Sequence, residues 1–231
     1  MVRARKKHED LATASRILNA AEEHFAAQGL AGARTDQIAL AAHANKAMLY
    51  YYFGNKSRLH RAVLENLLRQ FRSCVLAPPA KNLSASEKLL EIVTNYFDFL
   101  ATHPNYPRLI QREAMAAGRL DWMAREYFRP LHALLARTLT EGMASREFRT
   151  LDAEQMAQLA MGLTTSYFAA APILSQVVGH NLLAPRAVAA RKRALLDFLH
   201  HGVTRGKGNL RAPKSSATKV PATKAHGAKA R

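Results

Sequence analysis

The stretch that decides the fold is R-T-D-Q-I-A-L-A-A-H-A-N-K-A-M-L-Y-Y-Y-F, residues 34–53. It predicts two short helices joined by a tight turn. Thr35 is a good N-cap for the first helix, since its hydroxyl can accept from a first-turn N–H, and Asp36 places a negative charge at the positive end of the helix dipole. Asn45 is a good N-cap for the second helix, expected over 46–53. The first helix offers a small apolar face for packing, made of Ile38, Ala39, Ala41 and Ala42.

The second helix has two unlike faces. Successive residues advance by roughly 100°, so Leu49 and Phe53 share one side and must point into a core. Ala47 and Tyr51 project from the opposite side, next to Lys46. The flanks of that side carry Met48 and Tyr50. An exposed face of this composition needs a partner, and a helix-turn-helix places its second helix in the major groove of DNA.

Two runs resemble the TetR family (TetR/AcrR) of bacterial transcriptional regulators. These are L-Y-Y-Y-F-G-N-K at 49–56, which resembles the end of the family's recognition helix, and I-L-N-A-A-E-E-H-F-A-A-Q-G-L at 17–30, which resembles its first helix. The resemblance covers roughly residues 11–71. His43 stands in the turn where the family usually has glycine, and histidine tolerates a positive φ less well than glycine does.

The resemblance implies an all-α fold with an N-terminal three-helix helix-turn-helix domain and a larger helical domain. It also implies a homodimer, formed through the last two long helices, that binds an inverted-repeat operator on double-stranded DNA. The expected function is a ligand-responsive repressor, released by a small and mainly apolar effector. A nucleoid-type architectural protein with weak sequence preference stays open as the alternative.

The residues expected to contact DNA divide by chemistry. Hydroxyls and ammonium groups suit phosphate oxygens, whereas base edges are read by donors and apolar groups in the major groove. The phosphate candidates are Thr35, Tyr50, Tyr52 and Lys56, with Tyr51 on phosphate or on a base. Core packing is the alternative for the tyrosines; we accept it in part for Tyr52, which lies nearer the Leu49 side, and reject it for Tyr51. Lys46 is the best candidate to read guanine, and Ala47 and Met48 offer apolar surface to a thymine methyl. Arg34 and Asn45 complete the expected interface.

The charge of the chain supports a polyanionic partner. Its 231 residues hold 34 Lys/Arg against 17 Asp/Glu, a net +17 at pH 7. The ends are the most basic parts: residues 1–72 hold 12 basic and 6 acidic residues, and residues 207–231 hold 7 basic and no acidic ones. We expect a basic N-terminal arm at 1–10 and a disordered basic tail at 207–231, because the tail has almost no large apolar residues.

Other features exclude classes of protein. The single cysteine, Cys74, excludes an intramolecular disulfide and fits the cytoplasm; we expect it to be a small buried hydrophobe. No secretory signal or membrane span is expected. The chain lacks H-E-x-x-H, G-x-S-x-G, C-x-x-C and a glycine-rich phosphate loop, so no enzyme, metal site or cofactor is predicted. The protein is therefore expected at the nucleoid, in the cytoplasm.

The remaining periodicity predicts helices only. Thr13 is expected to cap the first helix and Gly29 to end it, and a long helix is expected to follow from 56 or 57. Later helices are expected from Ser84 or Ser86 to 103, over 108–117 and over 120–145 with a kink at Pro130. Two more are expected, one capped by Asp152 that ends near 175 with Pro172 close to its end, and one over 185–203. We expect a DNA-binding domain at 11–71 and an effector-binding and dimerisation domain at 72–206. Large polarisable side chains are the candidates for the effector pocket: Phe71, Tyr96, Met115, Trp122, Met123, Tyr127, Met156, Tyr167 and Phe168.

Overall fold

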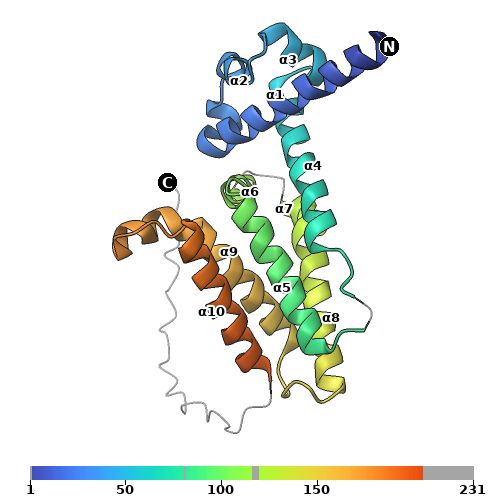
Figure 1. Ribbon diagram of the computed structural model, residues 1–231, viewed down its shortest axis with the longest axis vertical. Coiled ribbons are helices and arrows are strands. Elements are labelled where there is room, and N and C mark those ends of the chain that lie inside the picture. The colour runs from blue at the N-terminus through green and yellow to red at the C-terminus, as the bar shows by residue number, and fades with distance from the viewer. Residues whose placement is uncertain (1, 81, 116–119, 205–231) are drawn as a thin grey trace, which may run out of the picture.

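The computed structural model describes residues 2–80, 82–115 and 120–204, and every regular element in these ranges is helical. A head of three helices lies at one end, a long fourth helix leads away from it, and a larger helical body lies below (Figure 1). The predicted all-α class is confirmed. The expected tail at 207–231 lies outside the described residues. No helix among the described residues is long and apolar enough to cross a membrane.

The head consists of α1 (Val2–Gly32), α2 (Thr35–Ala41), α3 (Lys46–Phe53) and the first turns of α4 (Lys56–Val75). Its core is a set of fully buried apolar side chains, one or two from each helix, namely Ile17, Phe25, Ile38, Leu49 and Leu59. Since α2 and α3 are only seven and eight residues long, their stability depends on this packing rather than on their own propensity.

Three local expectations for the head are wrong. Helix α1 begins at Val2, so Thr13 does not cap it; Thr13 lies inside the helix, where its hydroxyl accepts from Arg16. Thr35 is the first residue of α2, and the capping position is held by Arg34 without a side-chain cap. Ala41 is exposed, because only the other side of α2 faces the core.

The turn and the start of α3 agree with expectation. His43 has φ 49°, the left-handed conformation that glycine adopts without strain. The side chain of Asn45 accepts from the Met48 N–H at 2.8 Å and caps α3. The chain therefore forms the helix-turn-helix with histidine at the glycine-like position.

The head is tied to the body at the end of α1. Gly29 has φ 70° and interrupts the regular helix, which frees carbonyls of the preceding turn. Arg112 donates to the Ala26 and Ala27 carbonyls at 3.1 and 2.7 Å. Lys56 donates to the carbonyls of residues 31 and 33. Both cations thus lie at the negative end of a helix dipole.

The body begins with α5 (Ala85–Thr102), closed at its start by the Ser84–Glu87 capping box, and α6 (Tyr106–Met115). The single helix expected over 120–145 is divided into α7 (Leu120–Met123), the π-helix η1 (Ala124–Phe128) and α8 (Arg129–Ala144). Pro130 explains the wide turn, because it lacks an N–H and its ring displaces the carbonyl four residues earlier.

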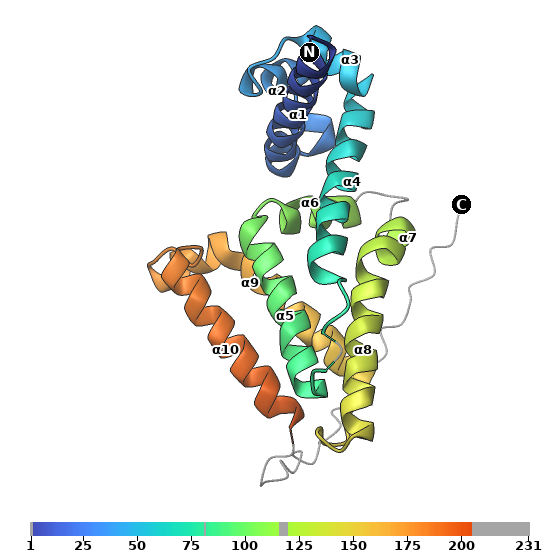
Figure 2. The same cartoon turned by 45° about the vertical axis from the view of Figure 1, so that its right-hand side comes forward.

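The body ends with α9 (Ala153–Val178), which passes behind α5 toward α8, and α10 (Pro185–Val203), which lies at its outer edge (Figure 2). Asp152 caps α9 as expected. Pro172 lies inside α9, and the helix continues for six further residues.

Cys74 is exposed, not buried as expected. Leu67, Phe71 and Val75 form the buried stripe of α4, and Cys74 lies one position off that stripe.

Candidate nucleic-acid interface

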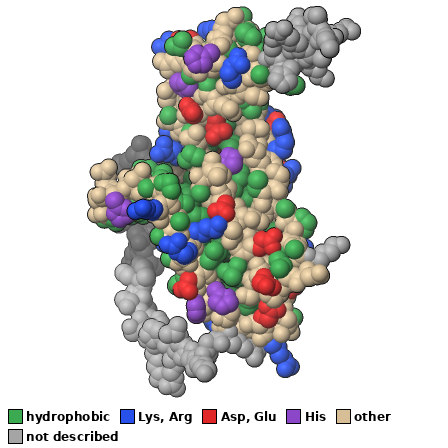
Figure 3. Space-filling view, viewed as in Figure 1, with side chains coloured by type: hydrophobic (Ala, Val, Ile, Leu, Met, Phe, Trp, Pro, Cys, Tyr) green, Lys and Arg blue, Asp and Glu red, His purple; other side chains and the backbone are tan. Residues whose placement is uncertain are grey.

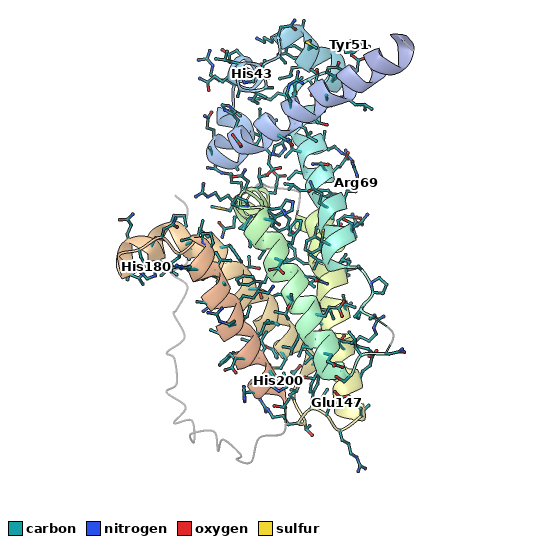
Figure 4. All side chains as sticks on the ribbon, viewed as in Figure 1. His43, Tyr51, Arg69, Glu147, His180 and His200 are labelled. Atoms are coloured by element: carbon teal, nitrogen blue, oxygen red, sulfur yellow. The ribbon has the colours of Figure 1, made fainter. Side chains whose placement is uncertain are left out.

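The side of α3 turned away from Leu49 is open to solvent. Leu49 is fully buried, whereas Tyr51 is 78% exposed and Ala47 is also exposed. Figure 4 places Tyr51 and His43 at the outer end of the head, opposite Glu147 and His200 at the far end of the body. The face that the sequence assigns to a partner is therefore uncovered and lies at the outer end of the molecule.

The side chains of Lys46 and Thr35 both lie close to Tyr50. Its ring lies 5.9 Å from Lys46 Nζ, a cation–π distance, and its hydroxyl lies 3.4 Å from Thr35 Oγ1. The start of α2 and the first turns of α3 thus present two hydroxyls and an ammonium group side by side. The two hydroxyls of this group are suited to phosphate oxygens.

Arg34 is held at the start of α2 by its neighbour. Its guanidinium donates to both oxygens of the Asp36 carboxylate, at 3.2 and 2.7 Å. The hydrogen bond from Arg34 lowers the pKa of Asp36, and the same bond raises the pKa of Arg34. A phosphate would have to compete with Asp36 for this guanidinium.

Three of the residues predicted to contact DNA have side chains that interact with the protein itself. Tyr52 donates to Asp10 at 2.9 Å, and burial followed by this hydrogen bond raises the pKa of its phenol. The Lys56 ammonium is engaged with two carbonyls of the chain after Gly29. Met48 is partly buried against the core. These side chains therefore brace the helix-turn-helix from within the head, and the DNA contacts assigned to them stay predictions.

Sequence reasoning missed Arg16. Its Nε donates to the Ala42 carbonyl at 3.1 Å, at the point where α2 ends and the turn begins. The two residues are 26 positions apart, so no local spacing signals this contact. Arg16 fixes the end of α2, and with it the turn that orients α3.

Among the described side chains, the effector candidates lie in different surroundings. Phe71 stacks on Tyr106 with ring centroids 5.9 Å apart, and burial raises the pKa of Tyr96 to about 12. Tyr167 and Phe168 pack around Phe97 in the core. Met115 is 88% exposed and does not fit an enclosed pocket. Met156 is partly buried, Trp122 lines a groove beside α4, and the side chains of Met123 and Tyr127 lie outside the described residues.

Comparison with known families decides what this arrangement is. Residues 17–63 match the family described as bacterial regulatory proteins, tetR family, and residues 86–199 match the tetracyclin repressor-like C-terminal domain. The chain belongs to the TetR family. The helix-turn-helix expected at the TetR-like stretch coincides with the first of these matches.

Curated relatives of this TetR-family chain are repressors by name. It is 39% identical over 110 residues to the HTH-type transcriptional repressor SCO4008 of Streptomyces coelicolor, covering 48% of this chain and 54% of the relative. It is 31% identical over 106 residues to the HTH-type transcriptional repressor NicS of Pseudomonas putida, covering 46% of this chain and 50% of the relative. The chain thus spans about half the length of each of these two relatives.

A solved structure shares the fold over most of the TetR-family chain. This is the transcriptional regulator FadR of Bacillus subtilis in complex with stearoyl-CoA, with a TM-score of 0.62 and 24% identity over 81% of this chain and 98% of that one. At this identity the likeness establishes the fold alone.

Proposed function

We propose that this TetR-family protein is a sequence-specific transcriptional repressor that binds an inverted-repeat operator as a homodimer. The observation that carries the proposal is the exposed Ala47–Tyr51 face of α3, capped by Asn45 and set at the outer end of the head. A recognition helix inserts such a face into the major groove, with its first-turn residues nearest the base edges. This role requires access to the chromosome, so we place the protein in the cytoplasm.

The outer edge of the body supports dimerisation through α9 and α10. Large apolar side chains are exposed there, and hydrophobic side chains lie on the protruding α9–α10 turn and the adjoining body (Figure 3). Burying such a patch against a second copy removes it from water. The most exposed members are Ile173 at 73%, Val177 at 75% and Phe198 at 64%. We assign DNA binding to residues 11–71 and dimerisation and ligand response to residues 72–206.

We assign base reading to Lys46, and we propose that Tyr51, Tyr50 and Thr35 approach the phosphates. Binding should be measured by fluorescence anisotropy on an inverted repeat from the DNA upstream of the protein's own gene, and on random DNA. Lys46→Ala should lose about 1–3 kcal/mol of discrimination between the two. Arg69→Ala removes the same charge from the solvent face of α4 (Figure 4) and should keep the discrimination. Equal losses in the two variants would contradict the assignment.

The response to a small molecule is supported by the FadR structure, whose ligand stearoyl-CoA carries a long apolar acyl chain. We propose that this chain also takes an effector with an apolar body. The alternative of a nucleoid-type architectural protein has no support among these relatives, which are transcriptional repressors and regulators by name.

A further inference from the structure

A groove of about 450 Å³ lies at the junction of head and body, away from the DNA-facing side of α3. It is lined by α4 residues from Asn55 to Leu64, by Glu113 of α6 and by Trp122 of α7. At 1.5 Å per residue, this stretch of α4 gives the groove a wall about 13 Å long. The groove therefore has room for an elongated small molecule.

The charges around the groove favour an anion. Within the described part of the chain, the Arg58 guanidinium makes no ion pair, whereas Arg61 is paired with Glu65 at 2.8 Å. Glu113 also lines the groove, but it is only 5% exposed and its Oε1 lies 3.4 Å from His60 Nε2. Arg58 is thus the exposed and uncompensated charge of the groove.

We propose that this groove is an effector site for an organic anion with an apolar body. Arg58 would hold the acid group through paired N–H donors, which match the geometry of a carboxylate. Trp122 would cover the apolar body with its ring. The inference rests on the proposed function for its regulatory meaning, and it adds a location and an acid group to the effector with an apolar body proposed above.

The site touches both elements that hold the end of α1. Glu113 is the neighbour of Arg112, which donates to the Ala26 and Ala27 carbonyls. On the other wall, the groove begins beside Lys56, which donates to the carbonyls of residues 31 and 33. A ligand that binds better to one arrangement of α4 and α6 shifts the head toward that arrangement. Occupancy of the groove would thereby change the affinity for DNA.

The binding test uses Trp122, which is the only tryptophan of the chain. The probes are 4-phenylbutyrate, 4-phenylbutyramide and 4-phenylbutylamine, which share an apolar body and differ in charge. The full-length protein should show a saturable fluorescence change with the anion and a much weaker one with the amide and the amine. Arg58→Ala should weaken binding of the anion about tenfold, because it removes a charge-assisted contact. The matched control Arg69→Ala, on the same helix but outside the groove, should bind as the unchanged protein does.

Three results would overturn the site: no saturable change with 4-phenylbutyrate, an equal response to the three probes, or equal affinity in Arg58→Ala and Arg69→Ala. A further possibility is that Arg58 contacts a DNA phosphate instead. In that case Arg58→Ala would weaken binding to all DNA sequences and lower the salt dependence, with no effect of the probes.

The second arm measures DNA binding in the presence of 4-phenylbutyrate. The probe should lower operator affinity in the unchanged protein and in Arg69→Ala, but not in Arg58→Ala. If 4-phenylbutyrate changes the Trp122 fluorescence in a saturable way but leaves the affinity for the operator unchanged, the regulatory part of the inference is rejected. Loss of the preference for operator over random DNA, measured without probe, would instead reject the proposed function, and the fluorescence arm would still decide the groove.

Discussion

Removing Arg112 should loosen the head from the body. In the structure this side chain lies on α6 and donates from Nε and Nη2 to two carbonyls of α1, residues 86 and 85 positions earlier in the chain. Those carbonyls are available because Gly29, at φ 70°, interrupts the helix that would otherwise use them. In Arg112→Ala they would be left to water and would lose the cation at the negative end of the helix.

The size of the effect follows from the exposure of the contact. A buried hydrogen bond to a charged group contributes about 1.5–3 kcal/mol. Arg112 is exposed and only its Nε contact is partly buried, so solvent screening reduces the sum of the two bonds to about 1–2 kcal/mol. For a domain of this size each kcal/mol lowers Tm by about 2–4 °C, which gives a loss of about 2–8 °C.

The assay is thermal unfolding together with amide hydrogen exchange of the end of α1. Arg108→Ala is the matched control, because Arg108 is exposed on the same helix one turn earlier. Arg112→Ala should unfold at a lower temperature than Arg108→Ala, and the amides near residues 26–33 should exchange faster. If the two variants have the same Tm and the same exchange at α1, Arg112 does not fasten the head and the reasoning fails.

Three further predictions follow from other contacts. Gly142→Ala should destabilise by about 1–3 kcal/mol in urea unfolding, since its Cβ would lie 2.1 Å from the Phe148 ring, whereas Gly162→Ala, with nothing within 4 Å, should not destabilise. Glu147→Gln should lower Tm at neutral pH. Hydrogen bonds from the backbone N–H groups of residues 86 and 85 lower the pKa of Glu147 in the folded protein. The carboxylate therefore contributes fully to stability above its pKa in the unfolded chain, and this contribution is lost as pH falls through its pKa in the folded protein. The Tm difference should therefore shrink toward acid, and a constant difference would contradict this account. Asn45→Ala should cost about 1 kcal/mol of stability through the lost cap and weaken operator binding, and Asn45→Asp should retain the stability.

What the sequence predicts well is local. The caps at Asn45, Ser84 and Asp152 form within three residues of their partners, and the exposure of Tyr51 follows from its angle to Leu49 on one short helix. The left-handed His43 is likewise signalled by its place in the turn.

What the sequence does not predict depends on distant partners. Tyr52 donates to a carboxylate 42 positions away, and Lys56 to carbonyls 25 and 23 positions away. These acceptors turn two expected DNA contacts toward the head itself. The effector pocket stays a prediction for a related reason, because core and pocket use the same residue types and the sequence alone does not separate them.

Because Cys74 is exposed, its thiol can be labelled with a spectroscopic probe in the unchanged chain. A single thiol near the end of α4 can take one dye or spin label per protomer without any substitution. In a homodimer, the distance between the two labels would change with the tilt of the two α4 helices, which connect the heads to the bodies. The same accessibility also allows two molecules to become cross-linked in air, so measurements of assembly require a reductant.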